Sequence, residues 1–412
     1  MKTDQKPDIQ GVRMKRNTET SGQAVFNQNH RIFSNNYKIS PRQIRRAVTL
    51  ELFGASSLLL PGYLAETSGI GGVAALLAGG AGALALLAVW NRLAQKCDFS
   101  VEEDLKHRQA EGSSAGNMLF RRILQVAAGA GVTGIAAYVL YLLTVLVREQ
   151  LLDANYEPAI LITLTLAGVI GLWKGLESRI RIYEVLFWFL LIPLAVILII
   201  ACVSVNPAFW TISRMTTAGF FRSCYASFMF FAISALFLFF RPHCSQPEKA
   251  AGSVRGGLLT ALGMNVAVYL ILLGIFQQKL LAHLDYPVIF LMAVVKLPGE
   301  FFERQDALMT GIWFFCLFAL FASLLFYGKE LLRGGFSRKK KPEKNQEQGQ
   351  TAASPEFWWS ASCGGAVFAA AFCLLKAEGL APAVLRVIFG GVGPVLLLLP
   401  FVYYLCAGRK GK

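Results

Sequence analysis

One stretch near the start of the chain carries residue types that could bind a ligand inside a membrane. Glu51 lies within the apolar run from Ala47 to Leu64, where an ionised acid is costly unless it meets a partner or water. Four small residues follow it: Gly54, Ala55, Ser56 and Ser57. Glycine, paired serines and the later Pro61 weaken a helical backbone, so this pattern predicts a break near the middle of the helix. Backbone N–H groups freed by the break could hold a small anionic ligand. The alternative is a helix whose small residues permit close packing.

A second charged cluster precedes a later apolar run, in the segment KLPGEFFERQDALMTGIW from Lys296 to Trp313. Three acids, Glu300, Glu303 and Asp306, surround Arg304 there. Acids at a helix N-terminus are stabilised by the helix dipole, and on the residues alone this ordinary helix start is favoured. The alternative is an ion-paired cluster that guards the outer mouth of a pathway.

Glu184 is a third candidate, because it follows Arg181 by three residues near the start of another apolar run. It could pair with Arg181 at helical spacing, or it could face Glu51 and the cytosolic end of the first span. Enzyme chemistry is not indicated: the four histidines lie in tails or loops, and no metalloprotease, hydrolase-elbow or Walker motif occurs. The eight cysteines form no C-x-x-C pair. We therefore expect no enzyme activity, no cofactor and no metal.

The elements that would position these residues are membrane-spanning helices. With 412 residues, 55% hydrophobic and 16% charged, the chain is too apolar for a soluble protein. Runs of about 20 apolar residues cross a bilayer. Ten spans are predicted, over residues 47–64, 70–90, 123–147, 158–173, 182–205, 220–240, 258–276, 307–327, 357–375 and 383–406. The octet Val288 to Val295 is too short to cross, and we expect it at the interface or in a re-entrant segment.

The positive charges follow this topology. When the N-terminus is taken as cytosolic, 32 of the 40 lysines and arginines fall in the two tails and in the loops after the even-numbered spans. Basic residues accumulate on cytosolic loops, so both ends are predicted in the cytosol and the net charge of +15 does not indicate nucleic-acid binding. The predicted organisation is a disordered basic tail over 1–44, a ten-helix domain over 45–408 with a basic cytosolic loop at 328–356, and a cytosolic tail at 409–412. Ten helices with a broken first span further suggest a five-plus-five inverted repeat.

With these residues in place, the chain resembles the B subunits of spore germinant receptors, the GerAB-like spore germination permeases of the amino acid–polyamine–organocation transporter superfamily. Three stretches carry the resemblance: ISPRQ...LFGASSLLLPG at Ile39 to Gly62, RIRIYEVLF at the start of the fifth span, and LPGEFFERQDAL before the eighth. The resemblance runs from Ile39 to Cys406. At the sixth span the chain departs from its relatives, because Ala232 to Phe240 contains neither the glycine nor the acid that they usually carry.

The resemblance implies an all-α LeuT-type fold with a discontinuous first helix. It also implies a subunit that binds a nutrient, such as an amino acid, in the inner membrane of the dormant spore. The partners implied are an A subunit, a lipoprotein C subunit and the lipid bilayer, with no nucleic acid. In such folds the ligand lies where spans one, three, six and eight meet. This placement carries over onto Gly54, Ala55, Ser56 and Ser57, and further onto Tyr138 and Phe230.

Three functions follow from these observations. The first is a non-enzymatic receptor subunit in which a nutrient binds at the first span, shifts the helix bundle and passes a signal to partner subunits or opens an ion path. The second is an amino acid transporter driven by protons or sodium. The third is a membrane scaffold that has lost ligand binding.

Overall fold

The computed structural model describes residues 39–96, 115–152, 156–173, 175–210, 216–294, 305–336, 355–377 and 379–406, and these residues form helices. The first half contains α2 (Pro41–Ser68), η2 (Gly69–Gly71), α3 (Gly72–Lys96), α5 (Ala115–Gln150), α6 (Glu157–Trp173), α7 (Gly175–Val203) and η3 (Pro207–Phe209). The second half contains α8 (Thr217–Ala232), η4 (Ile233–His243), α9 (Pro247–Leu281), α10 (Pro287–Val294), α11 (Gln305–Phe336), α12 (Pro355–Lys376), α13 (Leu380–Val387), η5 (Ile388–Val392) and α14 (Gly393–Cys406).

Each of the ten predicted spans falls on helical structure. Within the described ranges, eight helical stretches are long and apolar enough to cross a membrane. The first of these, Pro41–Gln95, contains both α2 and α3, which are joined by η2. Gly69, the first residue of η2, adopts a positive φ of 53° at this turn of the chain. The shorter apolar helix α6 supplies the fourth predicted span. The all-α membrane fold expected from hydropathy is therefore confirmed.

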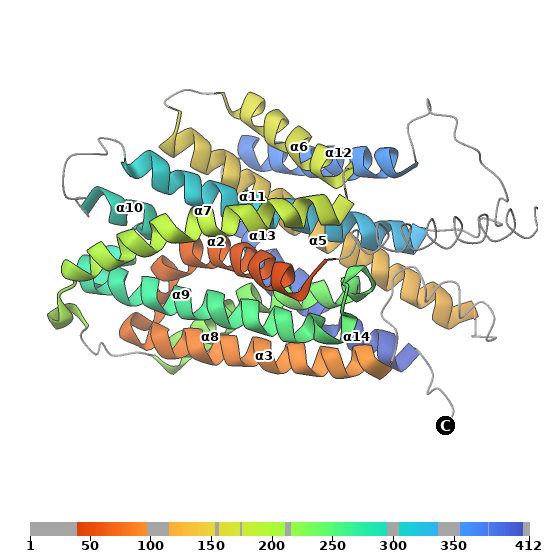
Figure 1. The fold of residues 1–412 in the computed structure, drawn as a ribbon, viewed down its shortest axis with the longest axis horizontal. Coiled ribbons are helices and arrows are strands. Elements are labelled where there is room, and N and C mark those ends of the chain that lie inside the picture. Colours follow the sequence, from red (N-terminus) through yellow and green to blue (C-terminus); the bar gives the residue numbers. More distant parts are fainter. Residues whose placement is uncertain are drawn as a thin grey trace, which may run out of the picture.

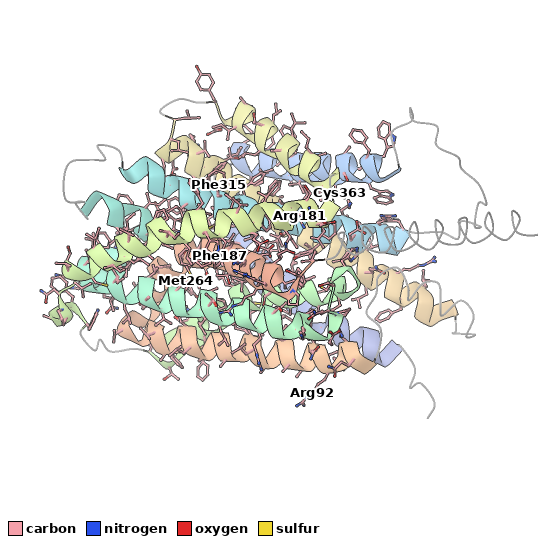
Figure 2. All side chains as sticks on the ribbon, in the orientation of Figure 1. Arg92, Arg181, Phe187, Met264, Phe315 and Cys363 are labelled. Carbon is pink, nitrogen blue, oxygen red and sulfur yellow. The ribbon has the colours of Figure 1, made fainter. Side chains whose placement is uncertain are left out.

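The bundle is organised around α2, which lies near its middle in Figure 1 and packs against α7, α8, α9 and α11. The most extensive pairings join α5 to α11, α2 to α9, and α3 to α8. By contrast, α6 and α12 pack together at the periphery. Outer helices carry bare apolar side chains (Figure 2): on α7, Phe189 is 66% exposed and Val203 is 87% exposed. In a membrane-spanning helix such a surface faces lipid.

The N-terminus of α2 is stabilised by residues adjacent to it in the sequence. Ser40 and Gln43 form a capping box, in which Ser40 Oγ accepts a hydrogen bond from Gln43 N (3.3 Å) and Gln43 Oε1 accepts one from Ser40 N (3.0 Å). Pro41 follows at the first helical position, where no N–H is needed. Ile39 also pairs with the end of η4 and the segment that follows, because its N–H donates to His243 O (3.1 Å) and its carbonyl accepts from Ser245 N (2.9 Å).

The predicted break in the first span is wrong, because α2 is one continuous α-helix through the small residues and Pro61. Ser56 Oγ and Ser57 Oγ each donate to the carbonyl four residues earlier, on Leu52 and Phe53, at 2.6 Å. This bonding satisfies the hydroxyls without opening the backbone ladder. Gly54 instead allows close approach: a Cβ at this position would lie 2.5 Å from Cys316 Cβ on α11. The small residues therefore serve helix packing, the alternative that the sequence left open.

Irregular backbone occurs instead elsewhere in the described chain, at Gln277 near the end of α9 (φ 61°) and in the sixth and tenth spans. The sixth span changes from α-helix to a 3-10 helix at Ile233, and Ser234 Oγ donates to Phe231 O at 2.7 Å beside the change. The tenth span contains a π-helical turn, η5, between α13 and α14. A long 3-10 stretch or a π-helical turn within a span often marks a functional position.

Candidate functional site

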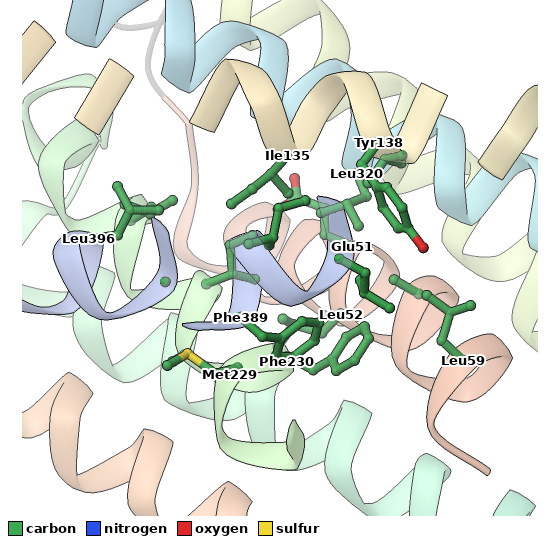
Figure 3. Close-up of a pocket in the computed structure, with 18 of the residues that line it drawn as sticks. Glu51, Leu52, Leu59, Ile135, Tyr138, Met229, Phe230, Leu320, Phe389 and Leu396 are labelled. Atoms are coloured by element: carbon green, nitrogen blue, oxygen red, sulfur yellow. The ribbon is translucent and has the colours of Figure 1, made fainter. Parts of the chain in front are cut away.

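A cavity of about 110 Å³ lies between the spans at the centre of the bundle. One water needs about 10–15 Å³ measured in this way, so the cavity has room for a small organic ligand. Its walls come from α2, α3, α5, α8, η4, α11, α13, η5 and α14, and Figure 3 shows several of these segments around it. The lining side chains are mainly aliphatic and aromatic.

One face of α2 lines the cavity. Glu51, Leu52, Ala55 and Leu59 contribute to the wall. Positions 51, 55 and 59 are spaced by four residues and therefore lie on one stripe of an α-helix. Gly54 lies on a different stripe and packs against α11, so α2 uses one face for the cavity and another for helix packing.

Glu51 is the acidic group of the cavity, and it is 9% exposed. Its Oε1 accepts a hydrogen bond from Ser323 Oγ on α11 at 2.5 Å. Among the described residues, none donates a hydrogen bond to the other carboxylate oxygen, Oε2. Ser323 Oγ in turn lies 3.5 Å from the hydroxyl of Tyr183, which donates to Ala319 O at 2.8 Å. The polar contacts of Glu51 therefore tie α2 to α11, and α7 supports them from behind.

Aromatic side chains line the cavity beside this acid. The rings of Phe230 on α8 and Phe389 on η5 pack at 5.5 Å between centroids (Figure 3). Tyr138 on α5 is 8% exposed, lines the cavity and packs at 6.0 Å from Tyr141. No hydrogen bond joins the Tyr138 hydroxyl to a residue in the described part of the chain. The walls thus combine aromatic surfaces with two oxygen-bearing groups, Glu51 and Tyr138.

The structure separates the six predicted ligand-binding residues into two groups. Ala55, Tyr138 and Phe230 line the cavity. Ser56 and Ser57 are fully buried away from it, and Ser57 Oγ accepts a hydrogen bond from Trp313 Nε1 at 2.9 Å. With Gly54 against α11, these three small residues belong to the packed faces of α2.

Glu184 contacts the start of the first span, which is one of the two contacts that its sequence position allowed. Its carboxylate accepts from Arg46 Nη1 at 2.5 Å and from Gln43 Nε2 at 2.9 Å. The Arg46 guanidinium also lies over the rings of Phe187 and Trp188 at 5.7 and 5.4 Å. This cluster joins the start of α2 to α7, and Glu184 does not line the cavity where Glu51 lies.

The predicted cluster before the eighth span lies largely outside the described residues, since Glu303 and Arg304 are not among them. Asp306 is in the first turn of α11, and its side chain is not described.

The tenth span was not among the predicted ligand-binding segments, yet Leu385, Phe389 and Leu396 from it line the cavity. The segment FGGVG at 389–393 contained a signal, because closely spaced glycines within an apolar span indicate irregular backbone or close approach.

Comparisons with known proteins agree with this architecture. Residues 38–342 match the spore permease family, described as spore germination protein. Spore germination protein YndE of Bacillus subtilis (strain 168) is 22% identical over 216 residues, which cover 50% of this chain and 57% of that protein. The match thus spans little more than half the length of this relative.

A solved structure of a Na⁺-coupled sialic acid symporter, in a substrate-bound outward-open state, has a similar fold. Its TM-score is 0.58 at 14% identity, and the similarity covers 89% of this chain and 80% of that one. At this identity the likeness establishes the transporter-type fold alone.

Proposed function

The chain belongs to the spore permease family of spore germination proteins, and we propose that it is the membrane subunit of a receptor for a nutrient that triggers germination. Its family and fold are those of permeases rather than of enzymes. The observation that carries the proposal is the central cavity, which has room for a small ligand and is bounded by α2 together with helices from both halves of the chain.

In this proposal a small nutrient enters the cavity and changes the packing of the bundle. A ligand shifts such an equilibrium only if it binds one arrangement better than the other. The cavity suits this role because Glu51 and Ser323 join α2 to α11 at its wall, and Phe230 and Phe389 join α8 to the tenth span. A ligand that contacts Glu51 and either ring therefore acts on several helices at once.

We further propose which subunits the protein contacts and in which membrane it lies. An A subunit and a lipoprotein C subunit would receive the signal in the inner membrane of the spore, with both chain ends in the cytosol. The start of α2 and the end of α14 lie toward the same end of the bundle in Figure 1, which supports placing the ends on one side.

The test is to fill the cavity from the face of α2 that lines it. We expect Ala55→Leu to reduce the affinity of the purified protein in lipid nanodiscs for its nutrient by at least about tenfold, because the added side chain occupies the ligand's space. A spore carrying this variant should need a correspondingly higher nutrient concentration to germinate. Ala78→Leu on α3 is the matched control, since Ala78 is exposed at the outer surface. Unchanged binding and germination in Ala55→Leu would reject the cavity as the receptor site.

An ordinary transporter driven by protons or sodium is the alternative, and the similarity in fold to a coupled symporter is its support. Uptake of the nutrient into liposomes that contain this protein alone would favour the transporter. Binding without uptake would favour the receptor.

A further inference from the structure

The cavity also indicates the charge of its ligand. Resting on the proposed receptor function, we infer that the cavity takes an organic amine in its cationic form with a small apolar body. The sequence had suggested the opposite polarity at this place, an anionic group held by the backbone N–H groups of a broken first helix.

An anionic group finds few donors in the cavity. No lysine, arginine, histidine, asparagine or glutamine is among the described residues that line it, and the side-chain donors there are the uncharged Trp90 indole and Tyr138 hydroxyl. The backbone of α2 is continuous at Ala55, so its N–H groups are used within the helix. An anion placed there would also meet the carboxylate of Glu51, and like charges at short range repel in a medium of low dielectric constant.

A cation finds acceptors at the same place. Ser323 occupies Oε1 of Glu51, and Oε2 receives no hydrogen bond from the described residues. Tyr138 also lines the cavity, and a tyrosine hydroxyl can accept a hydrogen bond. An ammonium group has three N–H donors and no acceptor, so it can donate to the open carboxylate oxygen of Glu51. Pairing with a cation also offsets the cost of an acid at membrane depth.

The aromatic pair adds to this selectivity. Phe230 and Phe389 line the cavity with their rings 5.5 Å apart. The face of an aromatic ring carries negative charge density and attracts an organic cation within about 6 Å, most strongly where water is excluded. The remaining aliphatic walls, such as Leu52 and Leu320, suit the apolar body of the ligand.

Arg179 is the charged group that faces this region from α7, and it does not line the cavity. Its Nη1 donates to Ala322 O on α11, and its guanidinium lies 4.9 Å from the centroid of the Phe326 ring. The described contacts include no direct ion pair between Arg179 and Glu51. Arg179 is therefore a nearby positive charge that neither bonds to Glu51 nor occupies the cavity.

The experiment compares four probes with the same branched alkyl group. Isopentylamine is cationic, L-leucine is the same molecule with an added carboxylate, 4-methylpentanoate is the anion, and isopentanol is neutral. Binding to the full chain in nanodiscs is measured by calorimetry, with empty nanodiscs subtracted to remove partition into lipid. We expect isopentylamine to bind at least about tenfold more tightly than each of the other three, since a tenfold ratio corresponds to one favourable charged contact.

Two variants test whether Glu51 is the source of the preference for the cationic amine. Glu51→Gln should weaken isopentylamine at least about tenfold and leave isopentanol within about threefold of its wild-type affinity, because only the charged probe loses its counter-charge. Glu66→Gln is the matched control on the same helix, because Glu66 is exposed and does not line the cavity. It should leave all four probes unchanged.

The outcomes separate this inference from the proposed function. Tighter binding of leucine or 4-methylpentanoate, lost in Ala55→Leu, would overturn the amine preference and keep the cavity as the receptor site. An amine preference that survives in Glu51→Gln, or no measurable binding of isopentylamine, would also overturn it. Amine binding that is unchanged in Ala55→Leu would overturn both.

Discussion

We expect Gly54→Ala to lower the free energy of unfolding of the bundle without placing any atom of the new side chain in the cavity. Gly54 lies where α2 crosses α11, and a Cβ built on it falls 2.5 Å from Cys316 Cβ and 3.0 Å from the Cys316 carbonyl carbon. Carbon atoms in contact prefer about 3.5–4.0 Å, so the two helices would have to separate by roughly 1 Å. The added methyl group does not reach the cavity, because Gly54 is not on the face of α2 that lines it.

The size of the effect follows from two opposing contributions. Overpacking of this kind costs about 1–3 kcal/mol. Alanine recovers about 1 kcal/mol over glycine within a helix, so the net loss should be up to about 2 kcal/mol. The free energy of unfolding can be followed by titrating the purified protein with SDS in mixed micelles. Gly134→Ala on α5 is the matched control, because a Cβ there meets nothing within 4 Å and should cause no loss.

A double-mutant cycle tests the named contact. Cys316→Gly removes the Cβ that the new methyl group would strike, so Gly54→Ala should cost at least about 0.5 kcal/mol less in that background. Equal stability of Gly54→Ala and Gly134→Ala would refute the packing argument. Loss of nutrient binding in Gly54→Ala at unchanged stability would restore Gly54 as a ligand-binding residue.

Two further variants test polar contacts that hold α2 in place. Ser57→Ala removes the acceptor of Trp313 Nε1 and should lower the free energy of unfolding by about 1–3 kcal/mol, whereas Ser253→Ala, which removes only an exposed hydroxyl bonded within its own helix, should change it by less than about 0.5 kcal/mol. A loss in Ser57→Ala no larger than in its control would contradict the buried contact. Glu184→Gln should cost about 1 kcal/mol in the same assay, because it leaves the Arg46 guanidinium without its counter-charge and Arg46 is only 7% exposed. Its control, Glu177→Gln, breaks an ion pair along one helix and should cost less than about 0.5 kcal/mol; equal losses would mean that the junction of α2 with α7 does not depend on this charge.

The helical layout could be predicted because it depends on local properties of the chain. A bilayer requires about 20 apolar residues in a helix, and runs of this length can be found without knowing their neighbours. The capping box at Ser40 and the short helix over 287–294 are also encoded within a few adjacent residues. The ten predicted spans matched helices for this reason.

The conformation of small and irregular segments was not predicted correctly. Gly54, Ser56 and Ser57 permit both a broken helix and a tightly packed one, and residue types alone do not say which occurs. The helix stays continuous because Gly54 packs closely against Cys316 and because the serine hydroxyls donate hydrogen bonds to carbonyls four residues earlier. The sixth span changes its hydrogen bonding at Ile233 without a glycine or proline at the change, so no local signal marked it.

The residues alone determined that the chain is an apolar, helical membrane protein, and they carried its family resemblance. They also indicated that the acid within the first span is important, because a carboxylate among apolar residues is evident in the sequence. Which faces of α2 meet α11 and which meet the cavity was decided only by tertiary packing, because helical periodicity defines stripes of residues but does not name their neighbours. The joining of Glu51, Tyr138, Phe230 and Phe389 around one space likewise depends on contacts between segments far apart in the chain.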